Sequence, residues 1–223
     1  MPVHFKICGV TSVEDAELSL AVGASAIGLN LVPSSPRAIG VETARQIAGA
    51  IGDRAISVLV VADRGVDEMT DLLRATGAAC LQLHGQEPPE IVERVLPHAY
   101  KAAHIGSPAD AARAEAYPGD YLLVDAKVPG KLGGTGVRVD WALVEPLARR
   151  RMLILAGGLR ADNVGEAIAR VRPFCVDVAS GVERENEPRR KDEAKLAAFA
   201  RAVREAGDAP DGSSPAPEPA LRR

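Results

Sequence analysis

A thiol stands at the end of a short strand-like run near the amino terminus. The run 5–11 has the sequence Phe-Lys-Ile-Cys-Gly-Val-Thr. In a β-strand, alternation would place Ile7 on one face and Lys6 and Cys8 on the other, because successive side chains point to opposite sides. An ammonium and a thiol on one face do not suit an ordinary apolar core. Parallel α/β proteins carry their chemistry at the carboxyl ends of strands, so we interpret Cys8 as a working group, with a packed small side chain as the alternative.

A carboxyl group occupies a similar position further along the chain. Asp125 ends the apolar run 121–124 and precedes the glycine-rich segment 128–139. Partial removal from water favours the neutral form of a carboxyl group and suits it to donate a proton near neutral pH. The glycine-rich segment beside it would act as a lid. The competing interpretation is that Asp125 caps a loop or a helix.

Two glycine-containing turns follow the last two strand-like runs. Gly157 and Gly158 come after the first of these, and Ser180 and Gly181 come after the second. Glycine lets backbone N–H groups approach an anion closely, and a helix that follows the turn directs its positive end at the same place. A pair of such turns on neighbouring strands predicts a phosphate site, whereas one turn alone would indicate only a tight bend.

Further polar residues follow other strands. Arg37 lies on a proline-containing loop, where a guanidinium is suited to grip a carboxylate with two hydrogen bonds; most surface arginines have no such role. His84 and Asp177 stand at or near strand ends, among the inward residues. His84 would orient a substrate hydroxyl or titrate, and the alternative is that it serves only as a hydrogen-bonding neighbour. A metal site formed by Cys8, His84 and His104 has no supporting ligand spacing, so we expect no metal.

Strand-like and helical patterns alternate eight times between about residues 3 and 207. This alternation is typical of a parallel sheet built from βα units, and eight units favour a (β/α)₈ barrel over a doubly wound open sheet. The first strand lacks the Gly-x-Gly-x-x-Gly sequence of the open-sheet nucleotide-binding proteins. The expected strands are Val3–Cys8, Ala26–Leu31, Ala55–Val61, Ala79–His84, Ala99–His104, Tyr121–Asp125, Met152–Ala156 and Cys175–Ala179.

The length, composition and charge of the chain limit its number of domains and its kinds of partner. The 223 residues are 47% hydrophobic with a formal charge of -3, which allows one large domain or two small ones. The single repeating α/β pattern favours one domain, residues 1–207, followed by a proline-rich tail, residues 208–223, expected to be disordered. The interleaved charges indicate no nucleic-acid or membrane partner. Three widely spaced cysteines and the lack of a signal peptide or membrane-length apolar run predict a cytoplasmic protein. Its oligomeric state stays open between a monomer and a homodimer.

The order of these groups around a closed barrel predicts a reaction class. The sixth strand would bring an acid, the seventh and eighth an anion site, the first a thiol and the second a cation. A small substrate with a phosphate at one end and a carboxylate at the other would span the mouth of the barrel. Cys8 and Asp125 would then move protons on its carbon skeleton, which is isomerase chemistry.

Together the motifs resemble the phosphoribosylanthranilate isomerases of tryptophan biosynthesis, over roughly residues 3–205. The resemblance rests on the sequences at 6–11, 35–37, 82–85, 133–136 with 140–141, 156–159 and 177–183, and on Asp125, Asn163 and Lys191-Asp192. It implies an Amadori rearrangement without a cofactor, with Asp125 as general acid and Cys8 as general base. It also implies that Arg37 binds the anthranilate carboxylate, and that the turns at Gly157-Gly158 and Ser180-Gly181 bind the phosphate.

Some positions depart from the family pattern. Arginines at 189 and 190 stand where Pro-Gly is usual, which leaves the loop after the eighth strand uncertain in shape. Two other functions compete with this one. A histidine-pathway barrel performs a similar rearrangement, but it is two-fold repeated and has Asp where Cys8 stands. A non-catalytic phosphate-binding barrel is the second alternative, and the presence of both Cys8 and Asp125 argues against it.

Overall fold

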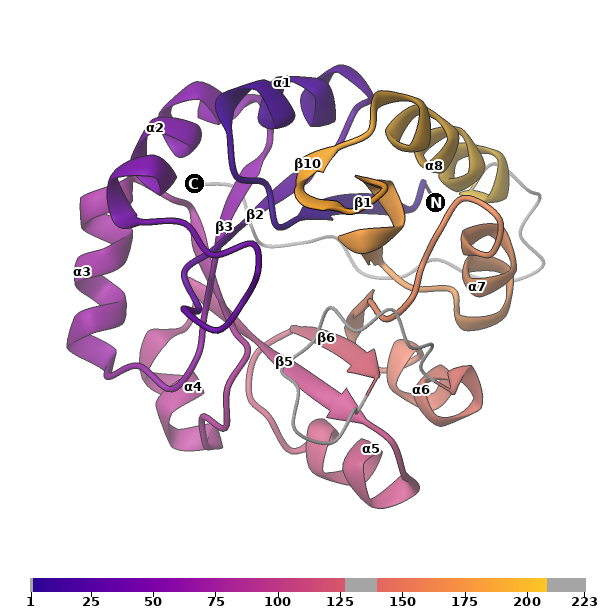
Figure 1. Ribbon diagram of the computed structural model, residues 1–223. Helices are drawn as coiled ribbons and strands as arrows, with labels where there is room; N and C mark the ends of the chain where they lie inside the picture. The colour runs from indigo at the N-terminus through magenta and orange to yellow at the C-terminus, as the bar shows by residue number, and fades with distance from the viewer. Residues whose placement is uncertain (1, 127–139, 208–223) are drawn as a thin grey trace.

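The strands close into a parallel barrel with the helices around it. The computed structural model describes residues 2–126 and 140–207, and Figure 1 shows the ring of helices around the strands. The neighbour order is β1 to β8 around the ring, with β8 pairing back to β1. The strands are β1 (His4–Cys8), β2 (Ala26–Asn30), β3 (Ile56–Val61), β4 (Cys80–Leu83), β5 (Ala99–Ile105), β6 (Tyr121–Ala126), β7 (Met152–Leu155) and β8 (Cys175–Val178).

All eight strand predictions are confirmed to within one residue at each end. A (β/α)₈ barrel is therefore the fold, and the open doubly wound sheet is excluded by the pairing of β1 with β8. The helices are α1 (Val13–Ala21), α2 (Val41–Ile51), α3 (Val66–Thr76), α4 (Pro89–Val95), α5 (Pro108–Glu115), α6 (Trp141–Ala148), α7 (Val164–Val171) and α8 (Glu193–Gly207), with short 3₁₀ turns η1 (Gly52–Arg54) and η2 (Ser180–Val182).

Local sequence explains where the helices begin and which face they bury. Ser12 is the N-cap of α1 and accepts a hydrogen bond from the Asp15 N–H at 3.1 Å, as the spacing predicts. Helix α8 packs on the barrel through Leu196 and Phe199, both 0% exposed, one turn apart on the same face. Burying such a side chain stabilises the fold by roughly 1.5–3 kcal/mol.

Alternation along each strand divides the apolar side chains between two cores. The outer core lies between the barrel and the helices and includes Ile7, Leu122 and Val124. The inner core fills the barrel with the side chains that alternate with these, among them Val58, Tyr100, Ala102, Leu123, Ile154, Ala156 and Cys175. Toward the carboxyl ends of the strands, a small further cluster of Cys8, Val32 and Val60 lies near buried polar side chains such as His84 and Asp125.

One element was not foreseen. After β8 and η2 the chain forms an antiparallel hairpin, β9 (Glu183–Arg184) and β10 (Glu187–Lys191), before α8 begins at Glu193. The hairpin lies beside β1 in Figure 1, and it is the segment in which the sequence has the unusual arginines. The predicted glycine-rich lid at 128–139 and the predicted tail at 208–223 lie outside the described residues.

Candidate active site

Cys8 and Asp125 both face the inside of the barrel at the carboxyl ends of their strands. Asp125 is two residues beyond Leu123, which belongs to the inner core, and Cys8 is next to the outer-core residue Ile7. In the ring, β1 and β6 are separated by β7 and β8, so the two groups approach the mouth from well-separated sides. Both are nearly buried, with exposed fractions of 8% for Cys8 and 7% for Asp125. Cys8 and Asp125 therefore lie at the same end of the barrel, on strands that are not neighbours.

A buried ion pair lies beside the thiol. The Lys6 Nζ is 2.8 Å from the Asp177 Oδ1, and the two residues are direct neighbours in the β1–β8 register. The same Nζ donates to the Gln82 Oε1 at 3.0 Å. Burial disfavours the charged ammonium, but Asp177 holds the pKa of Lys6 well above its usual value. A full positive charge is therefore fixed on the strand face that carries Cys8, as predicted, and Asp177 is its partner.

Neighbouring groups and burial shift the pKa of the Cys8 thiol in opposite directions. Burial raises its pKa above the ordinary value, Lys6 acts in the opposite direction, and Asp177 adds to the rise. Lys191 on β10 also favours the thiolate. Only a small fraction of such a thiol is ionised at neutral pH. The adjacent cations reduce the free-energy cost that burial adds to formation of the thiolate.

Gln82 fixes the protonation pattern of His84. Its Oε1 accepts hydrogen bonds from Lys6 and from the Tyr100 hydroxyl at 3.0 Å. Because an ammonium can only donate, the amide nitrogen must face the His84 Nδ1, which lies 2.8 Å away. The Nδ1 is then an acceptor, and the Nε2 carries the proton. Burial, with nearby His104, lowers the pKa of His84 to about 3, so the ring is a neutral hydrogen-bond donor near pH 7.

Arg37 is held firmly by its own loop and by an acidic partner. Asn30 at the end of β2 accepts from the Val32 N–H at 2.8 Å and donates to the Ser35 Oγ at 3.2 Å, which shapes the loop. The Arg37 Nε and Nη2 bond to the two carboxylate oxygens of Glu183 at 2.6 and 2.8 Å. One edge of the guanidinium is therefore filled, and a substrate carboxylate would bind to the remaining N–H groups.

The two glycine-containing turns pack against each other. Gly157 and Gly158 have positive φ values of 93° and 62°. A Cβ on Gly181 would lie 2.1 Å from the Leu159 carbonyl oxygen, so the second turn fits the first only as glycine. Asn163 secures the first turn by donating to the Gly158 carbonyl at 2.9 Å. As predicted, α7 follows the first turn, but only η2 follows the second directly, because the hairpin intervenes.

Replacing Gly181 with alanine tests how closely these turns must approach. We expect Gly181→Ala to separate them, to raise the KM for a phosphorylated substrate about tenfold or more, and to lower the free energy of unfolding by about 1–3 kcal/mol, as overpacking does. Steady-state kinetics and urea unfolding measure the two effects. Gly165→Ala on α7 is the matched control, since a Cβ there is 4.0 Å from Ala206. An unchanged KM in Gly181→Ala would contradict a phosphate site at this contact.

Sequence reasoning missed several residues of the site. Glu183 and Lys191 lie on the hairpin, and their buried side chains close the site on the side of Cys8. Alternation along β5 would have placed Tyr100 on the inner face. Gly28 on β2 was also overlooked: a Cβ there would lie 2.7 Å from the Cys8 Sγ, so glycine makes room for the thiol.

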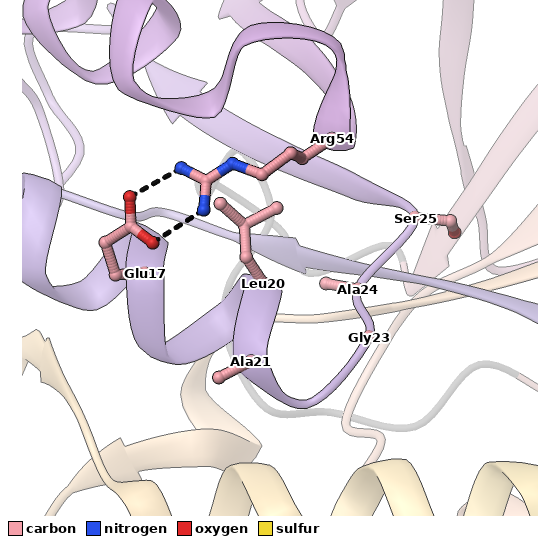
Figure 2. A pocket seen from close by; sticks show the side chains of 7 residues that line it. All are labelled: Glu17, Leu20, Ala21, Gly23, Ala24, Ser25 and Arg54. Atoms are coloured by element: carbon pink, nitrogen blue, oxygen red, sulfur yellow. Dashed lines mark hydrogen bonds and ion pairs between the residues drawn. The ribbon is translucent and has the colours of Figure 1, made fainter.

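A separate hollow lies at the opposite end of the barrel. It has a volume of about 430 Å³ and is lined by Glu17, Leu20 and Ala21 of α1, by residues 23–25 of the turn before β2, and by Arg54 of η1. Figure 2 shows the Glu17 carboxylate facing the Arg54 guanidinium across it. This ion pair uses the main polar groups of the hollow, and the hollow takes no part in the site at the carboxyl ends of the strands.

The described part of the chain lacks two further features. Within residues 2–126 and 140–207, no three His, Cys, Asp or Glu side chains are grouped so that they could hold a metal ion. None of the helices in these ranges has the combination of length and apolarity that crossing a bilayer requires.

Comparisons with known proteins agree with this architecture. Residues 5–202 match the family model described as N-(5'phosphoribosyl)anthranilate (PRA) isomerase. The N-(5'-phosphoribosyl)anthranilate isomerase of Pseudomonas paraeruginosa is 43% identical over 208 residues, which cover 92% of this chain and 97% of that protein. The protein of the same name from Myxococcus xanthus is 40% identical over 209 residues, again 92% of this chain and 97% of the relative.

Solved structures of phosphoribosyl anthranilate isomerases also match this chain. The crystal structure of phosphoribosyl anthranilate isomerase from Thermus thermophilus superposes with a TM-score of 0.81 at 39% identity, covering 90% of this chain and 98% of that one. A phosphoribosyl anthranilate isomerase in complex with reduced 1-(o-carboxyphenylamino)-1-deoxyribulose 5-phosphate superposes at 0.79 and 36% identity, covering 91% and 99%. This chain therefore belongs to the N-(5'-phosphoribosyl)anthranilate isomerase family.

Proposed function

We propose that Cys8 and Asp125 carry the two proton transfers by which this enzyme isomerises N-(5'-phosphoribosyl)anthranilate in tryptophan biosynthesis. The observation that carries the proposal is their placement: both are inward-facing, nearly buried and at the carboxyl ends of strands on separate sides of the mouth. A (β/α)₈ barrel presents its reacting groups at this end. Cofactor chemistry is not required, because the reaction is an isomerisation in which substrate and product contain the same atoms and no electrons are exchanged with another molecule.

The first step opens the sugar ring. Asp125 donates its proton to the ring oxygen as the bond between that oxygen and C1 breaks. The nitrogen lone pair forms a double bond to C1, giving a protonated Schiff base. A carboxyl group that is 7% exposed suits this role, because removal from water favours the neutral, proton-bearing form.

The second step removes the proton from C2. The Cys8 thiolate takes this proton, the C–H electron pair forms a C1–C2 double bond, and the nitrogen regains its lone pair. The resulting enolamine becomes the ketone when Cys8 gives the proton that it holds to C1 and the C2 hydroxyl gives its proton to the Asp125 carboxylate. Both groups are then back in their starting forms, and the product is 1-(2-carboxyphenylamino)-1-deoxyribulose 5-phosphate.

The two ends of the substrate fix its orientation. The anthranilate carboxylate binds to the N–H groups of Arg37 that Glu183 leaves unused, and the phosphate binds at the paired turns of Gly157-Gly158 and Ser180-Gly181. His84 supplies its Nε2–H to a substrate oxygen. Asp177 acts from the floor of the pocket, where it holds Lys6 beside the thiol.

Loss of phosphoribosylanthranilate fluorescence tests the function directly. Purified enzyme should convert the substrate, and the product should be confirmed by mass and by reduction with borohydride. Turnover of the histidine-pathway aminoaldose phosphate in place of phosphoribosylanthranilate would favour the related sugar-phosphate isomerase. Binding without turnover would favour a phosphate-binding partner protein and end the proposed mechanism.

Lys6 should lower the pH at which Cys8 becomes active. Lys6→Met removes the ammonium that opposes the effect of burial, so the thiol pKa should rise further and the rising limb of the kcat/KM profile should move to higher pH. At pH 7 the rate should fall about tenfold for each pH unit by which this limb moves. Asp177→Asn should move the limb the other way, because Asp177 raises the thiol pKa. An unmoved limb in Lys6→Met would remove Lys6 from the mechanism.

We further propose that the enzyme works in the cytoplasm as a monomer or a homodimer, with small molecules rather than nucleic acid as its partners. Its thiols Cys8, Cys80 and Cys175 are all free, which agrees with a reducing compartment. Light scattering on the purified protein distinguishes the two assembly states, and fractionation of the host cell tests the compartment.

A further inference from the structure

The β9–β10 hairpin carries two buried charged side chains that reach the site. Glu183 is 5% exposed and Lys191 is 0% exposed. Charged side chains are rarely buried so completely unless they are paired. The proposed chemistry assigns neither of them a proton or a substrate group, so their burial calls for another role.

Glu183 sets the orientation of Arg37. Its two oxygens accept from the Nε and the Nη2 of Arg37 in a fork geometry, which fixes the plane of the guanidinium. The Arg37 side chain passes directly over Gly9, where a Cβ would lie 2.3 Å from the Arg37 Cδ. Both ends of the arginine are thus constrained, and only its remaining N–H groups can turn toward a ligand.

Lys191 joins the hairpin to the strand that carries the thiol. Its Nζ donates to the Cys8 carbonyl at 2.7 Å, to the Ala179 carbonyl at 3.2 Å and to the Glu183 Oε1 at 3.2 Å. These three acceptors use all three N–H groups of the ammonium. The ends of β1 and β8 and the partner of Arg37 are therefore held at one point.

The unusual arginines attach the outer part of the hairpin to the same region. The Arg189 Nη1 donates to the Ala38 carbonyl at 2.9 Å and to the Pro36 carbonyl at 3.3 Å, on either side of Arg37. Its own carbonyl accepts from the Thr11 hydroxyl at 2.6 Å. Arg189 therefore docks the hairpin against the loops that follow β1 and β2, whereas the Arg190 Nη2 donates to the Glu14 carboxylate on α1 at 2.7 Å.

We propose that Glu183 and Lys191 are positioning residues, which act on the substrate carboxylate through Arg37 and on the proton transfer through Cys8. The proposal rests on the function proposed for Arg37 and Cys8. Glu183 presents the free N–H groups of Arg37, and Lys191 fixes the backbone of Cys8 and adds positive charge near its thiol. Arg189 reinforces the position of the Arg37 loop from outside.

Other charged and polar groups also face the thiol, so the contribution of Lys191 must be separated from theirs. Lys6 lies on the same strand, Asp177 on β8 and Tyr100 on β5, and Arg37 approaches from the loop after β2. Lys191→Met leaves all four in place. Its effect on the thiol is therefore specific to the hairpin.

The chain supplies a matched control for each variant. Lys101 on β5 is also buried, and it also donates to two carbonyls and one carboxylate, those of Leu83, Gly85 and Glu87. Glu17 forms a two-pronged pair with Arg54 like that of Glu183, but at the opposite end of the barrel (Figure 2). Variants of the control residues lose the same chemistry away from Cys8 and Arg37.

Substrate affinity tests the role of Glu183. Glu183→Gln should raise KM about tenfold with kcat changed less than about threefold, whereas Glu17→Gln should change neither.

Titration of the Cys8 thiol tests the role of Lys191. Lys191→Met should move the midpoint of the thiolate absorbance titration, taken as the difference from Cys8→Ser, to a pH higher by about 0.5 or more. Lys191→Arg should restore it, and Lys101→Met should lower thermal stability without moving it. Arg189 is exposed, so Arg189→Met should fold even if Glu183→Gln or Lys191→Met does not. Its KM should rise about threefold.

The outcomes separate this proposal from the proposed function. The proposal would be wrong if KM stayed unchanged in both Glu183→Gln and Arg189→Met and the thiol titration stayed unchanged in Lys191→Met. The hairpin would then have only a structural role, although the wild-type enzyme still turned over the substrate. Absence of turnover in the wild type would overturn the function instead. The thiol titration would still decide whether Lys191 acts on Cys8, because it needs no substrate.

Discussion

Cys8→Ala should lower kcat for phosphoribosylanthranilate by about 10³-fold or more, since proton transfer by a positioned side chain contributes roughly 10²–10⁴-fold. Cys8→Ser should fail nearly as completely, because a serine hydroxyl is not ionised near neutral pH. Binding of the reduced product analogue should persist in both variants. The carboxylate and phosphate sites are on other elements, the loop after β2 and the turns after β7 and β8. Stopped-flow fluorescence and calorimetry measure the two quantities.

The other two thiols are the controls for this prediction. Cys80 and Cys175 lie within the barrel, Cys175 as part of the inner core and Cys80 packed against it. Burial raises the pKa of Cys80 to about 12, so it cannot serve as a base near neutrality. Cys80→Ala and Cys175→Ala should keep kcat within about threefold of the wild type. Retained turnover in Cys8→Ala would remove the base from the mechanism.

Asp125→Asn should lower kcat by about 10²–10³-fold, because an amide fills the same space but cannot release a proton to the ring oxygen. Steady-state loss of phosphoribosylanthranilate fluorescence measures this effect.

Asp120 provides the matched control for this substitution. It is an exposed carboxylate just before β6 begins, at the end of the strand away from the site. Asp120→Asn should preserve the rate. If Asp125→Asn kept the wild-type kcat, another group on the rim would have to be the acid, and the assignment made from position alone would be wrong.

The inside of the barrel is layered, with an inner core of mainly apolar side chains and paired charged side chains nearer the rim. The inner core includes apolar side chains such as Val58, Leu123 and Ile154, and the Tyr100 hydroxyl joins this core to the polar groups above it by donating to Gln82. At the rim, the buried cations have acidic partners: Asp177 for Lys6, and Glu183 for Arg37 and Lys191. Removing one partner from such a buried pair costs about 3–5 kcal/mol. Substitutions at the rim therefore need the matched controls on folding and stability.

The eight strand predictions succeeded because alternation and β-branched runs are local properties. Side chains two residues apart share a face regardless of the rest of the fold, so the inward position of Cys8 followed from residues 3–8. The same reasoning placed Asp125 at the end of β6. The N-cap at Ser12 and the buried stripe of α8 are equally local. Family resemblance added roles to these positions, and the matches over residues 5–202 confirmed the family.

Pairings between distant segments were decided only by the tertiary structure. Lys6 and Asp177 are 171 positions apart, and Arg37 and Glu183 are 146 apart. Their contacts exist because β8 closes on β1 and the hairpin after β8 returns over the mouth. No local pattern records which carboxylate will meet which cation. The sequence by itself determined which residues face the mouth; closure of the ring decided which charges neighbour the thiol, because electrostatic interaction depends on distance through space.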